Sequence, residues 1–257
     1  MIDLHCHILH GIDDGSNSLE ESIKMARSAY EIGYRKICCT SHYGFGKYEN
    51  KNYKKKISEL SETLKSEGIP IEIYSGNELY LDLEGMRALV NGEVNTLGNS
   101  RYVLLEGVPG MTSDSLIGAI EKVIQSGYKP VLAHVERCFF LKMSDVEKLE
   151  EMGVVLQVNL SSFSDALKKR TTALLEKRLI HIVASDSHGT GRRSYEDADA
   201  GLKELKKIVG KDRMELLTRI NPKRILEDCQ IEGGGNEEKQ NINSSFFSRF
   251  FGKFFRN

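Results

Sequence analysis

The sequence predicts an α/β protein in which seven strands form a distorted TIM-like (β/α)7 barrel. Short apolar runs alternate with segments of helical period along most of the chain, which is typical of parallel strands joined by crossover helices. Histidine and carboxylate side chains recur where the apolar runs end. A closed ring of parallel strands brings all of these ends to one face, whereas an open doubly wound sheet, the alternative fold, does not.

Each predicted strand is a short apolar run next to a segment of helical period. The first helix is predicted to begin at Ser18, because Ser18 and Glu21 have the spacing of a capping box, and to end near Gly33. Helical period also marks residues 115–127 and 171–179. The seven predicted strands span residues 1–5, 34–41, 69–76, 101–107, 129–135, 153–159 and 179–186.

The composition excludes some classes of protein. The 257 residues include 36 basic and 37 acidic side chains, and the net charge of −1 gives no overall field for binding nucleic acid. The five cysteines are odd in number and two are adjacent in a predicted strand, which favours reduced thiols and a cytoplasmic protein. The sequence has no apolar run of about 18 residues, the length that spans a bilayer, and no leader-like N-terminus.

The composition changes after Cys229. Residues 1–229 are predicted to form the barrel domain, and residues 230–257 a flexible polar linker followed by an aromatic and basic tail. Six of the ten phenylalanines lie in 246–255, where helical spacing would separate them from the basic residues. Residues 245–256 are therefore predicted to contact an anionic membrane surface. A disordered tail, or packing against the barrel or a neighbouring subunit in a homo-oligomer, is the alternative.

Pairs of polar residues at two strand ends have the spacing of metal ligands. Strand residues i and i+2 point to the same face, so His5 and His7 aim two imidazoles in one direction. Asp186 and His188 repeat this spacing after the last predicted strand. A lone histidine is more often a surface or core residue, but two such pairs at strand ends favour a metal site.

The candidate metal ligands are too many for one ion and enough for three. Nitrogen and oxygen ligands without thiolate suit zinc, manganese or ferrous iron. Glu106 follows four apolar residues, where an unpaired carboxylate would be costly, although a solvated carboxylate is the alternative for Glu78 and Glu106. His10 and His181 are excluded, since His181 lies mid-strand and fits a barrel wall. The nine candidates are His5, His7, Asp14, His42, Glu78, Glu106, His134, Asp186 and His188.

These motifs resemble a known family. The stretches MIDLHCHILHGIDDG, TSHY, GNELY, LAHVER and ASDSHG with the following GRR are similar to the histidine motifs of the polymerase and histidinol phosphatase (PHP) superfamily. They most resemble its manganese-dependent protein tyrosine phosphatases, which are encoded with bacterial capsule and exopolysaccharide genes. The resemblance runs from Met1 to about Leu226 and implies a PHP-type barrel with a three-metal site.

The resemblance also implies a grouping of the ligands and a pair of phosphate-binding arginines. Three divalent ions are expected, manganese first, with iron or zinc as alternatives. Arg137 and Arg192 match the arginines that hold phosphate, and Arg193 competes with Arg192 because the register of that loop is ambiguous. The expected groups are His5, His7, Glu78 and Asp186 for one ion, Glu78, Glu106 and His134 for a second, and Asp14, His42 and His188 for a third.

By this resemblance the chain is expected to hydrolyse phosphotyrosine by a metal-bound hydroxide. Its expected substrate is a bacterial tyrosine kinase that regulates capsule or exopolysaccharide synthesis at the inner membrane face, where the tail would place the enzyme. No cysteine has an arginine six residues later, so a thiol nucleophile is disfavoured. The alternatives are a small-molecule phosphomonoesterase such as a histidinol phosphatase, a PHP nuclease, or a non-catalytic metal-binding regulator.

Overall fold

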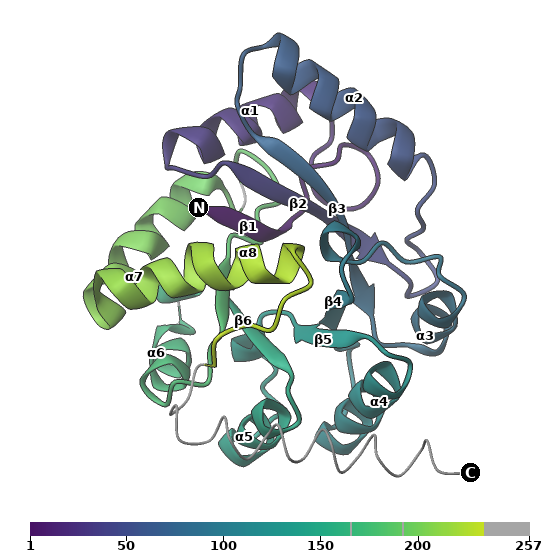
Figure 1. Cartoon of the computed structure of the whole chain (residues 1–257), viewed down its shortest axis with the longest axis vertical. Coiled ribbons are helices and arrows are strands. Elements are labelled where there is room, and N and C mark those ends of the chain that lie inside the picture. The colour runs from purple at the N-terminus through teal and green to yellow at the C-terminus, as the bar shows by residue number, and fades with distance from the viewer. Residues whose placement is uncertain (165, 192, 234–257) are drawn as a thin grey trace.

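The computed structural model describes residues 1–164, 166–191 and 193–233. Seven parallel strands follow one another around a barrel in chain order, and helices cover its outside (Figure 1). The predicted barrel is therefore confirmed, and the open doubly wound alternative is wrong. The strands are β1 (Ile2–Cys6), β2 (Lys36–Tyr43), β3 (Glu72–Tyr80), β4 (Tyr102–Glu106), β5 (Lys129–Leu132), β6 (Val155–Asn159) and β7 (Ile182–Ala184).

The barrel closes through the segment that follows β7. The Asp186 N–H donates to the His5 carbonyl at 2.9 Å, and the His7 N–H donates to the Ser187 carbonyl at 2.9 Å. The register of β1 against β2 also shifts between Asp3 and Cys6. This closure places the two predicted ligand pairs side by side.

A buried polar cluster supports the closure. The carboxylate of Asp3 accepts hydrogen bonds from the Ser185 hydroxyl at 2.5 Å and from the Tyr195 hydroxyl at 3.0 Å. Burial raises the pKa of Asp3, although these hydrogen bonds oppose the shift. The cluster links the first strand to the end of the last strand and to the helix that follows it.

The first helix begins as predicted. The Ser18 hydroxyl accepts the Glu21 N–H at 3.2 Å, and the chain turns at Gly33, whose φ is +106°. Glu21 accepts from the Asn17 N–H at 2.9 Å, so the predicted reciprocal half of the capping box does not form. The helices are α1 (Leu19–Glu31), α2 (Tyr53–Ser66), α3 (Leu83–Val90), α4 (Ser113–Gln125), α5 (Met143–Glu151), α6 (Lys168–Glu176), α7 (Tyr195–Glu215) and α8 (Asn221–Leu226).

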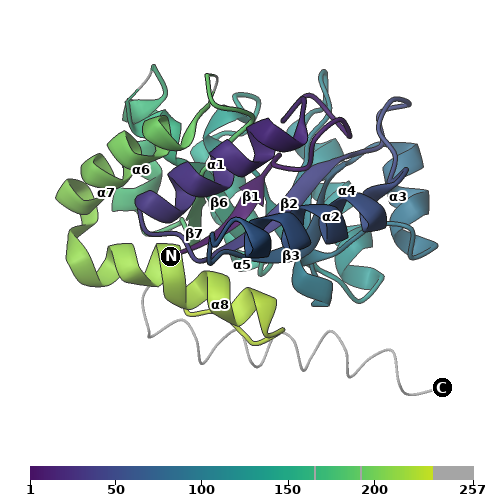
Figure 2. The same cartoon turned by 90° about the horizontal axis from the view of Figure 1, so that it is seen from above.

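The apolar core has two parts. The larger part lies between the strands and the surrounding helices, and the smaller part fills one end of the barrel interior. Ile225 of α8 is fully buried in this smaller core. The helical path bends at Gly210, where φ is +76°, and α8 then lies beneath the strands near the N-terminus (Figure 2). The amino ends of the strands are thus closed by a helix.

The end of the described chain is attached to α8. The Glu232 N–H donates to the Asn221 Oδ1 atom at 3.0 Å, and Arg224 pairs with the Glu232 carboxylate at 2.6 Å. Residues 234–257 lie outside the described residues, so the linker, the membrane-contacting tail and the domain boundary near 229 stay predictions. Within the described residues, we find no helix of the length and apolarity needed to cross a membrane.

Candidate metal centre

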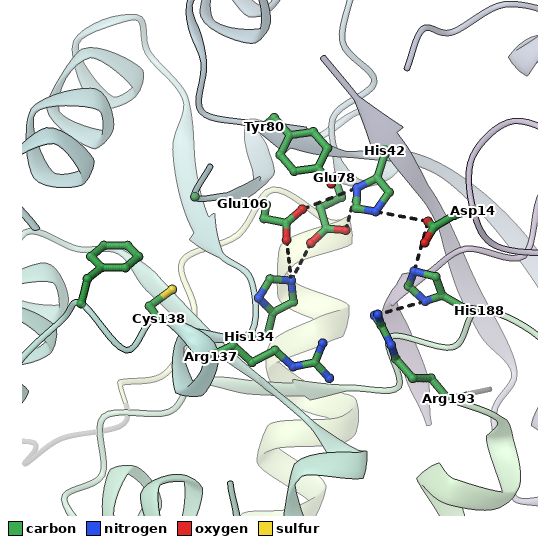
Figure 3. A pocket seen from close by; sticks show the side chains of 12 residues that line it. Asp14, His42, Glu78, Tyr80, Glu106, His134, Arg137, Cys138, His188 and Arg193 are labelled. Atoms are coloured by element: carbon green, nitrogen blue, oxygen red, sulfur yellow. Dashed lines mark hydrogen bonds and ion pairs between the residues drawn. The ribbon is translucent and has the colours of Figure 1, made fainter. Parts of the chain in front are cut away.

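All nine predicted ligands belong to one cluster at the carboxyl end of the barrel. Six of them, Asp14, His42, Glu78, Glu106, His134 and His188, line a cavity of about 260 Å³ (Figure 3). Seven of the nine are buried, whereas Glu106 is partly exposed and Asp14 is exposed. Their ligand atoms form four groups of three or four within which all atoms lie within 4.8 Å of one another. His10 and His181 belong to none of these groups, in agreement with their exclusion.

Glu78 lies at the centre of the cluster. Its Oε2 atom lies 3.1 Å from His5 Nε2 and 3.2 Å from His7 Nε2. The same oxygen lies 3.2 Å from His42 Nδ1, and Oε1 lies 2.9 Å from His134 Nε2. Glu78 is 1% exposed, so a carboxylate in contact with four imidazoles is almost completely withdrawn from water.

Asp186 completes the first ligand group that the resemblance implies. Asp186 Oδ1 lies 3.4 Å from His5 Nε2 and 3.5 Å from His7 Nε2. Asp186 has a left-handed φ of +52°, a strained conformation that is typical of functional sites. The first expected group, which adds Glu78, therefore has its atoms side by side.

The other two expected groups lie on either side of Glu78. Asp14 Oδ1 lies 3.5 Å from both His42 Nε2 and His188 Nε2. On the opposite side, Glu106 Oε1 lies 3.5 Å from His134 Nε2. His42 Nδ1 is also 3.6 Å from Glu106 Oε2, so the three groups form one continuous cluster rather than separate sites.

Residues that the sequence analysis missed hold the ligands in place. The Asp13 carboxylate lies 2.8 Å from His7 Nδ1 and accepts the His42 N–H at 2.9 Å. Gln157 Oε1 lies 3.2 Å from His5 Nδ1 and accepts the His134 N–H at 2.8 Å. Such partners fix the orientation of an imidazole and leave its other nitrogen free to bind a metal.

The electrostatics of the cluster fit divalent cations. Burial, together with the Glu78 charge, raises the pKa of Glu106 to about 7. Burial also lowers the pKa of His42 to about 4, which keeps its imidazole neutral. Glu106 Oε2, Asp186 Oδ1 and His42 Nδ1 are buried and have no hydrogen-bond partner. Buried atoms of this kind are costly unless they coordinate a cation.

Two arginines line the same cavity. Arg193 Nη1 lies 2.8 Å from Asp186 Oδ2, and Arg137 Nη1 lies 3.5 Å from the same oxygen. Both side chains are about 30% exposed, at 31% and 28%. Arg192, which the resemblance favoured over Arg193, lies outside the described residues, and the choice between them is untested.

The cysteines have the properties of structural residues. All five are free thiols, and four of them are buried. Cys138 lines the cavity, but burial raises the pKa of its thiol to about 12. The protonated thiol is a poor nucleophile, so the cavity relies on its histidines, carboxylates and arginines.

A parallel barrel with clustered histidine and carboxylate ligands at its carboxyl end defines a metal-dependent hydrolase fold. The family model described as capsular polysaccharide synthesis, CpsB/CapC, matches residues 1–227, and the chain belongs to this family. The predicted resemblance to the bacterial capsule tyrosine phosphatases of the PHP superfamily is confirmed.

Relatives and solved structures agree with this family. The tyrosine-protein phosphatase CpsB of Streptococcus pneumoniae is 32% identical over 90% of this chain and 100% of its own length. The tyrosine-protein phosphatase YwqE of Bacillus subtilis is 32% identical over 90% of this chain and 93% of its own length.

One structural match is described as YwqE from Bacillus subtilis and CpsB from Streptococcus pneumoniae, unique metal-dependent tyrosine phosphatases. It has a TM-score of 0.82 at 30% identity and covers 91% of this chain and 97% of the matched chain. Dihydropyrimidinase from Brevibacillus agri, at 11% identity and a TM-score of 0.56, shares the fold alone.

Proposed function

We propose that this chain is a metal-dependent tyrosine-protein phosphatase of capsular polysaccharide synthesis. The observation that carries the proposal is a cluster of nine histidine and carboxylate side chains, six of which line one cavity together with two arginines. The family model and the named activity of relatives at 32% identity support the same conclusion. The substrate is a phosphotyrosine protein, and we propose an autophosphorylated bacterial tyrosine kinase in particular.

The cluster is proposed to hold three divalent ions, with manganese favoured over iron or zinc. When bound, such ions lower the pKa of water and neutralise charge on a phosphoryl group. Glu78 belongs to two of the proposed ligand groups. The proposed groups are His5, His7, Glu78 and Asp186 for one ion, Glu78, Glu106 and His134 for a second, and Asp14, His42 and His188 for a third.

The other residues of the cavity bind and orient. We propose that Arg137 and either Arg192 or Arg193 donate to phosphoryl oxygens, for which the planar guanidinium is suited; Arg137 and Arg193 both line the cavity. Asp13 and Gln157 hold the rings of His7 and His5. A phenol has a pKa of about 10, so phosphotyrosine places a smaller demand on a general acid than an alkyl phosphate does.

A turnover panel tests this function and its alternatives. The protein with added manganese is given a phosphotyrosine peptide, a phosphoserine peptide, histidinol phosphate and a single-stranded oligonucleotide. We expect hydrolysis of the phosphotyrosine peptide to exceed that of the others. Preference for histidinol phosphate or the oligonucleotide would favour a small-molecule phosphatase or a nuclease, and turnover of none would indicate a non-catalytic metal-binding regulator.

We also propose that residues 245–256 contact the inner face of the membrane, which would place the enzyme near a membrane-bound kinase. The proposal is supported by the spacing of six phenylalanines among basic residues. The full-length chain should co-sediment with anionic vesicles at low salt, and a chain ending at Gln230 should not. Equal sedimentation of both chains would show that the tail is not what binds the membrane. Self-association of the full-length chain alone would favour a homo-oligomer.

A further inference from the structure

Aromatic side chains gather on one side of the proposed active site. Tyr80 lines the cavity, and its ring stacks on that of His42 with centroids 4.9 Å apart and an interplanar angle of 20°. Figure 3 shows Tyr80 beside His42 and Glu106. The ring of Phe45 lies 5.3 Å from that of Tyr80, and Tyr48 stacks on His42 at 5.2 Å. We call Phe45, Tyr48 and Tyr80 the aromatic wall.

Phe45 has an unfavourable backbone conformation, and its side chain is exposed. Its φ is +61°, in the left-handed region that costs a residue with a side chain about 1–2 kcal/mol. Its N–H donates to Asp82 Oδ2 at 2.7 Å, and the next N–H, of Gly46, donates to Glu84 Oε2 at 2.9 Å. The ring is nevertheless 49% exposed, so the protein does not use it to fill its core.

A second aromatic residue lies in another loop of the cavity. Phe140 lines the cavity and is 37% exposed. Its loop is held by Arg170 of α6, whose Nη2 donates to the carbonyls of Cys138 and Leu141 at 3.0 Å each. These hydrogen bonds fix the path of the loop that presents Phe140 to the cavity.

We propose that Phe45 and Tyr80 of the aromatic wall, together with Phe140, bind the phenyl ring of the substrate and thereby select aryl over alkyl phosphomonoesters. This inference rests on the proposed function, because it places the phosphoryl group between the arginines and the ligand cluster. The group esterified to a phosphoryl group bound there would lie next to the rings of Tyr80 and Phe140, which line the cavity. Contacts between aromatic rings are more favourable than the buried apolar area alone would give. The phenyl ring of phosphotyrosine can make these contacts, and the side chain of phosphoserine cannot.

Two non-hydrolysable ligands separate ring binding from chemistry. Phenylphosphonate and methylphosphonate share the phosphonate head and differ in the ring. Calorimetric titration of the manganese-loaded full-length protein measures both dissociation constants without turnover. We expect the preference for phenylphosphonate to fall about tenfold in F45N and in F140A, and methylphosphonate affinity to change less than twofold. Asparagine suits position 45 because it tolerates a left-handed φ.

Phe139 supplies a matched control. It is the same residue type as Phe140, at the preceding position of the same loop, and it is 70% exposed. Neither Phe139 nor Phe45 lines the cavity, but the Phe45 ring lies 5.3 Å from that of Tyr80, which does. F139A should therefore keep the wild-type preference, and thermal melting should show that all three variants fold. Equal weakening of both phosphonates, or equal loss in F139A, would overturn the inference. If the wild type prefers phenylphosphonate but does not hydrolyse phosphotyrosine, the proposed function fails and the ring site stands.

Discussion

The two ends of the barrel interior are built from the same strands but from opposite kinds of side chain. At the amino end, Leu4 of β1 and Leu104 of β4 are fully buried in an apolar core that α8 closes. At the carboxyl end, the same two strands supply His5 and Glu106 to the ligand cluster. Each buried aliphatic side chain at the first end stabilises the fold by about 1.5–3 kcal/mol. The second end gathers charges and leaves some buried polar atoms without a hydrogen bond.

This difference shows where stability and function reside in the molecule. Parallel barrels commonly have their sites at the carboxyl face and their stabilising contacts at the other. Variants at the carboxyl end should therefore change turnover with little loss of folding free energy, and variants at the amino end should do the reverse. Four experiments test this separation, in order of expected effect.

Metal removal should have the largest effect. We expect exhaustive chelation to reduce phosphotyrosine hydrolysis by at least about 10³-fold, because ions bound at this end would supply several kcal/mol of charge stabilisation. Added manganese should restore the rate. Steady-state hydrolysis of a phosphotyrosine peptide measures both.

Cys138 is the matched control for this experiment, since it lines the same cavity as a protonated thiol. C138S should retain most of the activity and the same sensitivity to chelation. Activity that survives metal removal, or is lost with the thiol, would contradict a metal-dependent site.

The arginines should have the next largest effect. R137A is expected to lower kcat by about 10²–10³-fold, the usual loss for one charged transition-state donor. R192A and R193A, compared side by side, identify the second donor, because only the one that holds phosphate should show a loss of this size. Elemental analysis should find unchanged metal content in R137A and in the affected variant. A fall in bound metal would instead assign that arginine to the support of Asp186, which both Arg137 and Arg193 approach in the structure.

The carboxyl end could be predicted from the sequence because its signals are local. Short apolar runs end at ionisable residues, and the fold class then brings those ends together. His5 and His7 could be paired from their spacing alone. Asp13 and Asp14 are adjacent in a loop without periodicity, so the sequence did not indicate that Asp13 would contact His7. Gln157 carried a usable signal, since an amide within an apolar strand needs a partner when buried.

The amino end was less predictable because its structure depends on tertiary packing. No local pattern indicates that α8 turns under the strands after Gly210. At the carboxyl end one strand boundary was also wrong, since the predicted third strand stopped at Gly76 but β3 continues through Tyr80 and includes Glu78. A Cβ at position 76 would lie 3.0 Å from Thr40 Cγ2, which is a tight contact, so Gly76 marks close packing rather than a strand end.

Ile225 tests the amino end. I225A removes a fully buried side chain from the apolar core and should lower the free energy of unfolding by about 2–5 kcal/mol. Denaturant titration measures this change, and K223A on the exposed side of α8 should stay within about 0.5 kcal/mol of the wild type. The kcat of folded I225A should equal that of the wild type. A lower kcat would show that the two ends are coupled.

The smallest expected effect is a pH dependence from His181, which lies just before β7, outside the strand in which it was predicted. Burial and the nearby Arg213 lower the pKa of His181 to about 4, and its Nδ1 accepts the Leu156 N–H at 3.1 Å. The unfolded chain binds this proton near pH 6.5, so it holds more protons than the folded chain between pH 6.5 and 4. The stabilisation is thus complete above pH 6.5 and is lost as the pH falls toward 4. Between pH 7 and 5 the loss amounts to about 2 kcal/mol.

Denaturant titrations of wild type and H181N at both pH values isolate this contribution. Asparagine keeps a hydrogen-bond acceptor at position 181 but does not titrate. The acidic cluster at the carboxyl end affects both proteins equally. Identical pH dependence in the two proteins would show that His181 does not titrate across this range.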